Sequence, residues 1–140
     1  MKKIPILLLL ILPLAALAAD VQAPAAGTDT KTVTLYYFHR TQRCAGCRNA
    51  EAKTFEAAKE TFAAQIEKGR LILKSVAVDG AADEKKVAEE FGAFGPSVFL
   101  AFSKDGKNEK IALDKMWDKL REGEGAYKVY IIENLKKYLP

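Results

Sequence analysis

The sequence has little of the residue types and motifs on which most active sites depend. Its 140 residues include two cysteines and one histidine. They contain no phosphate-binding loop, no dinucleotide fingerprint, no serine triad and no carboxylate pair arranged for hydrolysis. There is no internal repeat either. Nucleotide-dependent chemistry and serine hydrolysis are therefore not expected, and the two cysteines are the main candidates for chemistry.

An excess of charge of one sign is also missing. Lys and Arg total 22 against 18 Asp and Glu, which gives a formal net charge of +4 at pH 7. Without Lys2 and Lys3, which belong to the N-terminal segment, the charge falls to about +2. Such a balance does not predict a nucleic-acid partner.

Long apolar runs are confined to the N-terminus. Lys2 and Lys3 precede an almost wholly apolar run from Ile4 to Leu17, and Ala16-Leu17-Ala18 has the small-x-small pattern of a cleavage site. The run is shorter than the roughly 20 residues that span a bilayer, and no basic stop-transfer cluster follows it. We therefore expect residues 1–18 to be a cleaved signal peptide, with an uncleaved anchor as the alternative, and the protein to be exported to the periplasm or another extracytoplasmic compartment.

The remaining chain is long enough for one domain. Residues 19–30 are rich in Ala, Thr, Pro and Gly without apolar periodicity, which predicts a flexible tether. Residues 31–140 suffice for a single hydrophobic core and are too few for two domains.

Strand and helix patterns alternate along residues 31–140. Short β-branched and aromatic runs predict strands, and apolar residues spaced by three and four predict helices. The order β-α-β-α-β-β-α, with a short extra helix, predicts an α/β fold in which helices flank a central mixed sheet. The expected strands are 31–38, 70–78, 97–102 and 109–113, and the expected helices are 48–68, 83–91, 114–121 and 127–139.

Both cysteines fall in one short segment, "RTQRCAGCRN", between the first strand and the first long helix. Cys44 and Cys47 can close a small disulfide ring, and the first sits where helix N–H groups and the helix dipole stabilise a thiolate. Cys44 is therefore the candidate nucleophile, and Cys47 is the candidate resolving thiol. Arg43, Arg48 and the nearby Arg40 are expected to lower the pKa of the Cys44 thiol if they approach its sulfur.

The position of this pair resembles that in the thioredoxin fold, and the resemblance covers roughly residues 31–139. The segment "VAEEFGAFGPSVFLAF", residues 87–102, is similar to the thioredoxin segment that runs through a proline into the third strand. The resemblance implies that Gly95 and Pro96 face the cysteines and bind an extended substrate backbone, with a cis Gly95–Pro96 bond. The "YYFH" opening with C-x-x-C also resembles an exported thioredoxin-like group named for a nitrophenyl-compound nitroreductase.

The sequence departs from the thioredoxin pattern at three points. Arg43 stands where thioredoxins have Trp, and Ala45-Gly46 stands where they have Gly-Pro. The acid that thioredoxins bury in the first strand is replaced by Tyr37 or Phe38. Proton transfer from the resolving thiol is therefore expected to be slow, or to be assisted by His39.

His39, the single histidine, has three interpretations. It can be a hydrogen-bonded structural residue, it can modulate Cys44, or it can join Cys44 and Cys47 as ligands for Cu(I) or Zn. A structural zinc site usually needs four protein ligands, and the chain has no further Cys or His. Haem c attachment would require C-x-x-C-H, and position 48 is Arg.

The expected function is thiol-disulfide exchange with protein thiols, with the Cys44–Cys47 disulfide in place of any separate cofactor. A permanent structural disulfide is the less expected interpretation, because a disulfide across so small a loop removes little entropy from the unfolded state and so adds little stability. Two alternatives stay open: a partner-binding module with a structural or regulatory disulfide, and soft-metal binding. Electrons could flow either way, to or from an unidentified and possibly membrane-bound redox partner.

Overall fold

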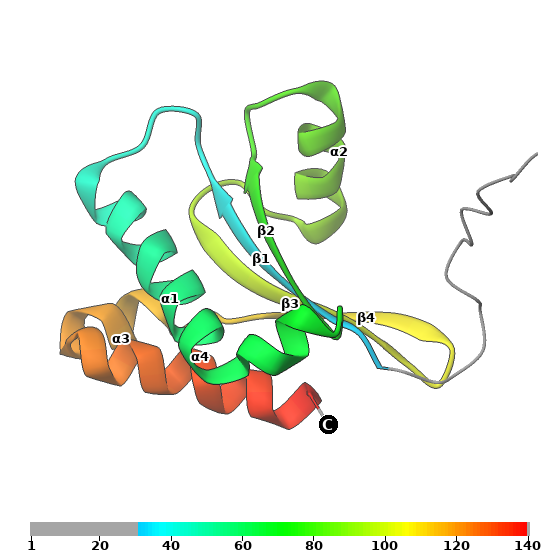
Figure 1. The fold of residues 1–140 in the computed structure, drawn as a ribbon. Coiled ribbons are helices and arrows are strands. Elements are labelled where there is room, and N and C mark those ends of the chain that lie inside the picture. The colour runs from blue at the N-terminus through cyan, green and yellow to red at the C-terminus, as the bar shows by residue number, and fades with distance from the viewer. Residues whose placement is uncertain (1–30, 140) are drawn as a thin grey trace, which may run out of the picture.

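A computed structural model describes residues 31–139, so the predicted signal peptide and tether lie outside the described residues. Within residues 31–139, strands and helices follow in the predicted order (Figure 1). The elements are β1 (Val33–His39), α1 (Ala45–Glu67), β2 (Leu71–Ala77), α2 (Ala82–Phe91), β3 (Ser97–Lys104), β4 (Lys107–Ala112), α3 (Met116–Glu122) and α4 (Glu124–Tyr138).

The strands form one mixed sheet in the order β2-β1-β3-β4. β1 runs parallel to β2, with Val33 opposite Leu71, and antiparallel to β3, with Phe38 opposite Ser97. β4 pairs with β3 as a hairpin. The parallel pair is joined through α1, as such pairs require a crossover connection. This topology confirms the predicted α/β, thioredoxin-like fold class, and it makes β1 an inner strand.

Helices cover both faces of the sheet, with α1, α3 and α4 on one face and α2 on the other (Figure 1). The alternation of side chains along β1 serves both layers. Leu35 and Tyr37 pack in the larger core with α1 and α4, whereas Phe38 packs in a smaller core with α2. All three side chains have no exposed surface. Burial on both faces explains why the strand reads as a continuous apolar and aromatic run.

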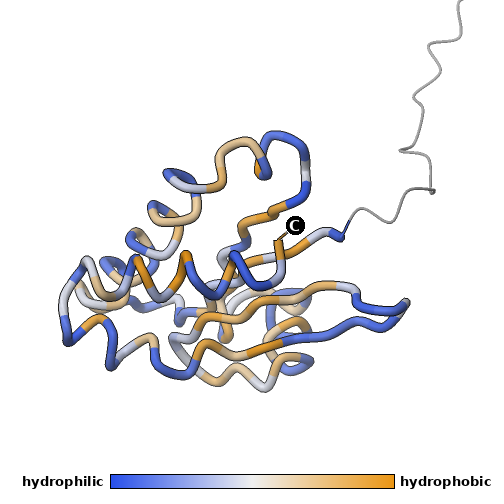
Figure 2. Tube along the Cα trace, turned by 90° about the horizontal axis from the view of Figure 1, so that it is seen from below, coloured by the Kyte–Doolittle hydropathy of each residue, from blue (hydrophilic) through white to orange (hydrophobic). Residues whose placement is uncertain are grey.

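The turn of the β3–β4 hairpin uses the predicted Asp-Gly pair. Asp105 and Gly106 both have left-handed backbone angles, with φ of 52° and 73°. A two-residue hairpin turn of this kind matches the twist of the strands and favours Asp-Gly. The projecting end of the hairpin is hydrophilic (Figure 2). Trp117 and Met116 of α3 pack against the core as expected, and Met116 is buried.

Two helices, α1 and α4, begin three residues earlier than the sequence pattern predicted, and α2 begins one residue earlier. α1 begins at Ala45 and not at Arg48, because the sulfur of Cys44 caps it. α4 begins at Glu124, inside a segment that two glycines marked as a break. The first turns of both helices lack the apolar periodicity from which the boundaries were predicted. None of the helices in residues 31–139 is long and apolar enough to cross a membrane.

Candidate functional site

Three connecting segments meet at one end of the sheet. His39 ends β1 opposite Ala77 of β2, and Ser97 begins β3 opposite Phe38, so the chain leaves β1 and β2 and enters β3 at the same end. The backbone N–H and the hydroxyl of Thr41 donate to the carboxylate of Asp79 at 2.7 and 3.2 Å. These two hydrogen bonds therefore connect the segment that carries the cysteines to the segment after β2.

Cys44 is the N-cap of α1. Its backbone is extended, with φ −73° and ψ 162°, and its sulfur accepts the backbone N–H of Cys47 at 3.1 Å. This contact satisfies one of the N–H groups that a helix start leaves without an intrahelical partner. Cys44 is exposed, Cys47 is half-buried, and both are free thiols. The structure thus places the first cysteine where an incoming group can reach it.

The two thiols differ in acidity. The hydrogen bond from the Cys47 thiol, followed by that from the Cys47 backbone N–H, lowers the pKa of Cys44 below its ordinary value. The same thiol–thiol hydrogen bond, together with partial burial, raises the pKa of Cys47. Donation to the charged form of a group favours that form. Cys44 is therefore the thiol that ionises first.

Tyr37 links the inner strand to the first turn of α1. Its hydroxyl donates to the backbone carbonyl oxygen of Cys47 at 3.0 Å. The side chain is fully buried, and this burial is the first cause of the raised pKa of its phenol. Tyr37, which with Phe38 was one of the two residues expected in place of the thioredoxin acid, serves as a hydrogen-bond donor to the turn that carries the cysteines.

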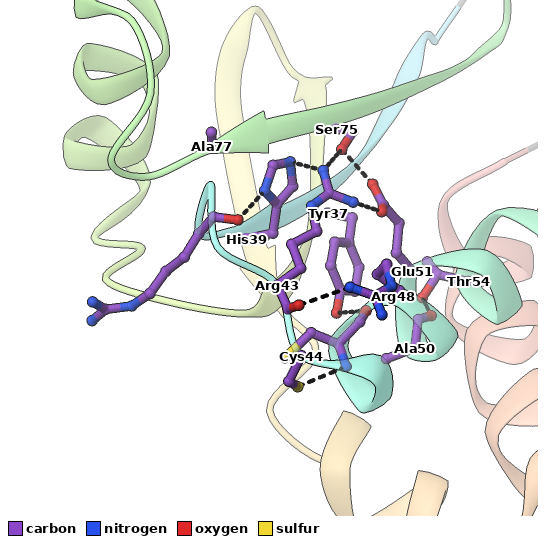
Figure 3. A network of polar contacts seen from close by, with 12 residues as sticks. Tyr37, His39, Arg43, Cys44, Arg48, Ala50, Glu51, Thr54, Ser75 and Ala77 are labelled. Atoms are coloured by element: carbon purple, nitrogen blue, oxygen red, sulfur yellow. Dashed lines mark hydrogen bonds and ion pairs between the residues drawn. The ribbon is translucent and has the colours of Figure 1, made fainter.

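Arg43 makes an ion pair with Glu51 of α1, although it directly precedes Cys44 in sequence. The side chains of Arg43 and Glu51 are 25% and 14% exposed. A second guanidinium nitrogen contacts Nε2 of His39 and lies 3.5 Å from Oγ of Ser75 in β2, and that hydroxyl donates to Glu51. Figure 3 shows the Arg43 side chain running toward Ser75 and Glu51, whereas the sulfur of Cys44 lies at the other end of the group. The guanidinium is thus held by three elements of the fold.

The other two arginines near the cysteines donate to backbone carbonyl oxygens. Arg48 donates to the carbonyl oxygen of Arg43 at 2.8 Å, a contact that spans the C-x-x-C turn. Arg40 is exposed and reaches the carbonyl oxygen of Phe94 at 3.4 Å, in the segment before β3. That contact brings the predicted substrate-binding segment next to the segment that carries the cysteines. The effect of these arginines on the pKa of Cys44 stays a prediction.

His39 is buried, with 7% of its surface exposed. Its Nδ1 lies 2.8 Å from the carbonyl oxygen of Arg40. A carbonyl oxygen only accepts, so Nδ1 carries the proton and Nε2 accepts from Arg43. Both ring nitrogens are therefore occupied. Among residues 31–139 no three His, Cys, Asp or Glu side chains form a group that could hold a metal ion, so His39, Cys44 and Cys47 are not brought together as ligands.

The expected cis bond between Gly95 and Pro96 is wrong, because no described peptide bond is cis. Trans is the default for X–Pro, and the Ser97 hydroxyl holds the turn by donating to the Gly95 carbonyl oxygen at 3.0 Å. Pro96 instead lines a pocket of about 130 Å³ with Met116 and Trp117 of α3. Whether Gly95 and Pro96 contact a substrate stays a prediction.

Sequence reasoning missed Glu51 and Ser75. Glu51 lies one helical turn after Cys47, so its spacing placed it on the same face of α1. Ser75 is a polar residue inside the otherwise apolar run "RLILKSVAV". Both signals were present, but nothing in the sequence showed that the two side chains would share the guanidinium of Arg43.

Fold and site together define a thioredoxin-like chain with a C-x-x-C pair at the start of its first helix. Comparison with solved structures finds a distant likeness to thioredoxin O2 from Arabidopsis thaliana in the oxidized state, at 17% identity and a TM-score of 0.39. The match covers 58% of this chain and 63% of the other, which is less than two thirds of its length. No protein-family model and no curated protein matches the chain. The fold assignment therefore rests on the topology described above.

Proposed function

We propose that this protein is an exported thiol-disulfide oxidoreductase that exchanges electrons with protein thiols through Cys44 and Cys47. The observation that carries the proposal is the asymmetry of the two thiols. Cys44 is exposed and has the lowered pKa, whereas Cys47 is half-buried and has the raised one. An attacking thiol must be accessible and ionised, and a resolving thiol acts only after the mixed disulfide forms.

In the reducing direction, the Cys44 thiolate attacks one sulfur of a substrate disulfide. A Cys44–substrate disulfide forms, and the other substrate sulfur leaves as a thiolate. Cys47 then attacks the Cys44 sulfur, so the Cys44–Cys47 disulfide forms and the second substrate thiolate leaves. The protein loses two electrons and two protons, and the substrate gains them as two thiols. The oxidising direction is the reverse, and the reduction potential decides between them.

The exposed side chain of Phe94, in the segment before β3, supports the binding of a protein substrate next to the cysteines. This side chain is 81% exposed, more than the other exposed large hydrophobic residues among residues 31–139, Ile72 and Val129. The Arg40 contact holds its backbone against the segment that carries the cysteines. We expect Phe94 to contact an apolar side chain near the substrate cysteine, and the Gly95–Pro96 turn to lie alongside the substrate backbone.

Export of the protein belongs to the proposal as well. The sequence of residues 1–18 supports secretion into an oxidising compartment, where disulfide chemistry is common. Expression of the full chain in a bacterium tests this directly. The periplasmic product should have the intact mass of residues 19–140, and a full-length product retained in the membrane fraction would contradict cleavage.

The deciding experiment is the equilibrium reduction potential of the cysteine pair, measured in a glutathione series with metal chelated. A value between about −120 and −270 mV would place the pair among exchange catalysts and show which way it drives electrons. A value below about −300 mV would mark a structural disulfide and leave a partner-binding module as the function. A Cys44→Ala variant, which retains Cys47, controls for reactions of a single thiol.

A further inference from the structure

The direction of the Arg43 side chain has a cause outside the C-x-x-C segment. The guanidinium contacts two neutral acceptors, His39 Nε2 and Ser75 Oγ, and one charged acceptor, the Glu51 carboxylate. A charge-assisted contact of Arg with a carboxylate is roughly twice as strong as a neutral hydrogen bond. Partial burial of both side chains reduces solvent screening of this contact. Glu51 is therefore the main anchor of the guanidinium.

We propose that Glu51 is a positioning residue that holds the guanidinium of Arg43 between α1 and β2, away from the sulfur of Cys44, and thereby limits the reactivity of this thiol. The inference rests on the proposed role of Cys44 as the attacking thiol. Arg43 is the residue next to Cys44 in the chain, so its long side chain can reach the sulfur once the anchor is removed. Figure 3 shows the guanidinium of Arg43 beside Ser75 and Glu51 at one end of this group of residues and the sulfur of Cys44 at the other end.

Two effects of Glu51 on Cys44 have to be separated. Glu51 lies two helical turns beyond Cys44, about 10 Å along the axis. At that distance its own charge acts weakly on an exposed thiolate, because about 10 Å is also the screening length at moderate salt. A released guanidinium within about 4 Å of the sulfur would lower the pKa of Cys44 by about 0.5 to 1 unit. The effect of Glu51 should therefore depend on the presence of Arg43.

The experiment measures the rate of iodoacetamide alkylation of the reduced protein as a function of pH, with fragment mass spectra assigning the label to Cys44. We expect Glu51→Gln to lower the midpoint of this profile by about 0.5 to 1 pH unit. The same change in an Arg43→Ala background should lower it by clearly less, which a double-mutant cycle quantifies. The matched control is Glu60→Gln on the same helix, which removes an exposed carboxylate paired with Lys128 and leaves Arg43 untouched.

An unchanged midpoint in Glu51→Gln, or an equal fall with and without Arg43, would overturn the proposal. Should Glu51→Gln fail to fold by circular dichroism, Ser75→Ala removes one neutral acceptor and keeps the ion pair. It should lower the midpoint in the same direction by a smaller amount, and no fall would again count against the proposal. The alkylation profile needs no substrate. A midpoint that shifts as expected in a protein that forms no mixed disulfides would therefore refute the proposed function and leave the positioning role intact.

Discussion

The hydroxyl of Tyr37 donates to the backbone carbonyl oxygen of Cys47 at 3.0 Å, and thereby ties the first turn of α1 to the inner strand of the sheet. Cys47 in turn donates its backbone N–H to the sulfur of Cys44 at 3.1 Å. One buried phenol thus supports one of the contacts that lower the pKa of Cys44, the backbone N–H of Cys47. The first turn of α1, which carries the two cysteines, is thus held by hydrogen bonds in which backbone groups take part.

Removal of the Tyr37 hydroxyl should affect both stability and reactivity. Tyr37→Phe leaves the Cys47 carbonyl oxygen without this donor, and we expect the free energy of unfolding to fall by about 0.5 to 1.5 kcal/mol. The looser first turn should also move the alkylation midpoint of Cys44 upward, toward that of an ordinary thiol. Urea unfolding and alkylation as a function of pH measure the two effects.

Tyr127→Phe is the matched control for Tyr37→Phe. Tyr127 is the other fully buried tyrosine of the described residues, burial raises the pKa of its phenol to about 12, and its hydroxyl bonds to Thr54 at 2.7 Å. It should cost a similar free energy of unfolding without shifting the Cys44 midpoint. Equal shifts in the two variants would show that Tyr37 acts only through global stability.

The roles of the two cysteines predict opposite results in trapping experiments. Cys47→Ala should accumulate a mixed disulfide between Cys44 and a disulfide-containing protein substrate, because the resolving thiol is gone. Cys44→Ala should accumulate far less, since Cys47 is half-buried, and burial still raises the pKa of its thiol when the hydrogen bond with Cys44 is gone. Non-reducing electrophoresis followed by peptide mass spectrometry measures both. A reversed outcome would exchange the two roles.

The pH dependence of Cys44 follows from its lowered pKa. The thiolate persists above the pKa and is lost as the pH falls through it, so Cys44 should stay reactive at a lower pH than a free cysteine of pKa about 8.5. The first cause of the lowering is the Cys47 thiol, and Cys47→Ala should therefore raise the midpoint of the alkylation profile. Thiolate absorbance at increasing pH checks this value independently. A midpoint that Cys47→Ala leaves unchanged would assign the lowering to the helix start alone.

Phe94 should matter for protein substrates only. Phe94→Ser removes an exposed aromatic contact, for which we expect kcat/KM toward a protein disulfide to fall roughly three- to tenfold. Reaction with a small disulfide such as oxidised glutathione should change little. Val129→Ser on α4, which alters another exposed apolar side chain, 53% exposed, is the control and should leave both reactions unchanged. An equal loss toward both substrates in Phe94→Ser would point to a disturbed cysteine segment.

Several features of the protein followed from local sequence pattern alone. The alternation of apolar runs and helical stripes predicted the order of elements, because burial of one face imposes those periods on any sequence. Asp105-Gly106 predicted the hairpin turn, since few residue pairs adopt two left-handed conformations. The spacing of Cys44 and Cys47 placed both at a helix start. These features depend on neighbours along the chain, which a sequence displays directly.

Other features were decided only when distant segments packed together. Arg43 lies next to Cys44 in sequence, yet its guanidinium is held by Glu51 and Ser75, which come from α1 and β2. Tyr37 lies within the predicted strand 31–38, and its hydrogen bond to Cys47 appears only because α1 packs against β1. A side chain takes its partner from the groups that tertiary packing brings within hydrogen-bond distance. The sequence by itself therefore determined the fold class and the place of the cysteine pair at a helix start. The tertiary structure decided which groups contact that pair and that the guanidinium of Arg43 points away from it.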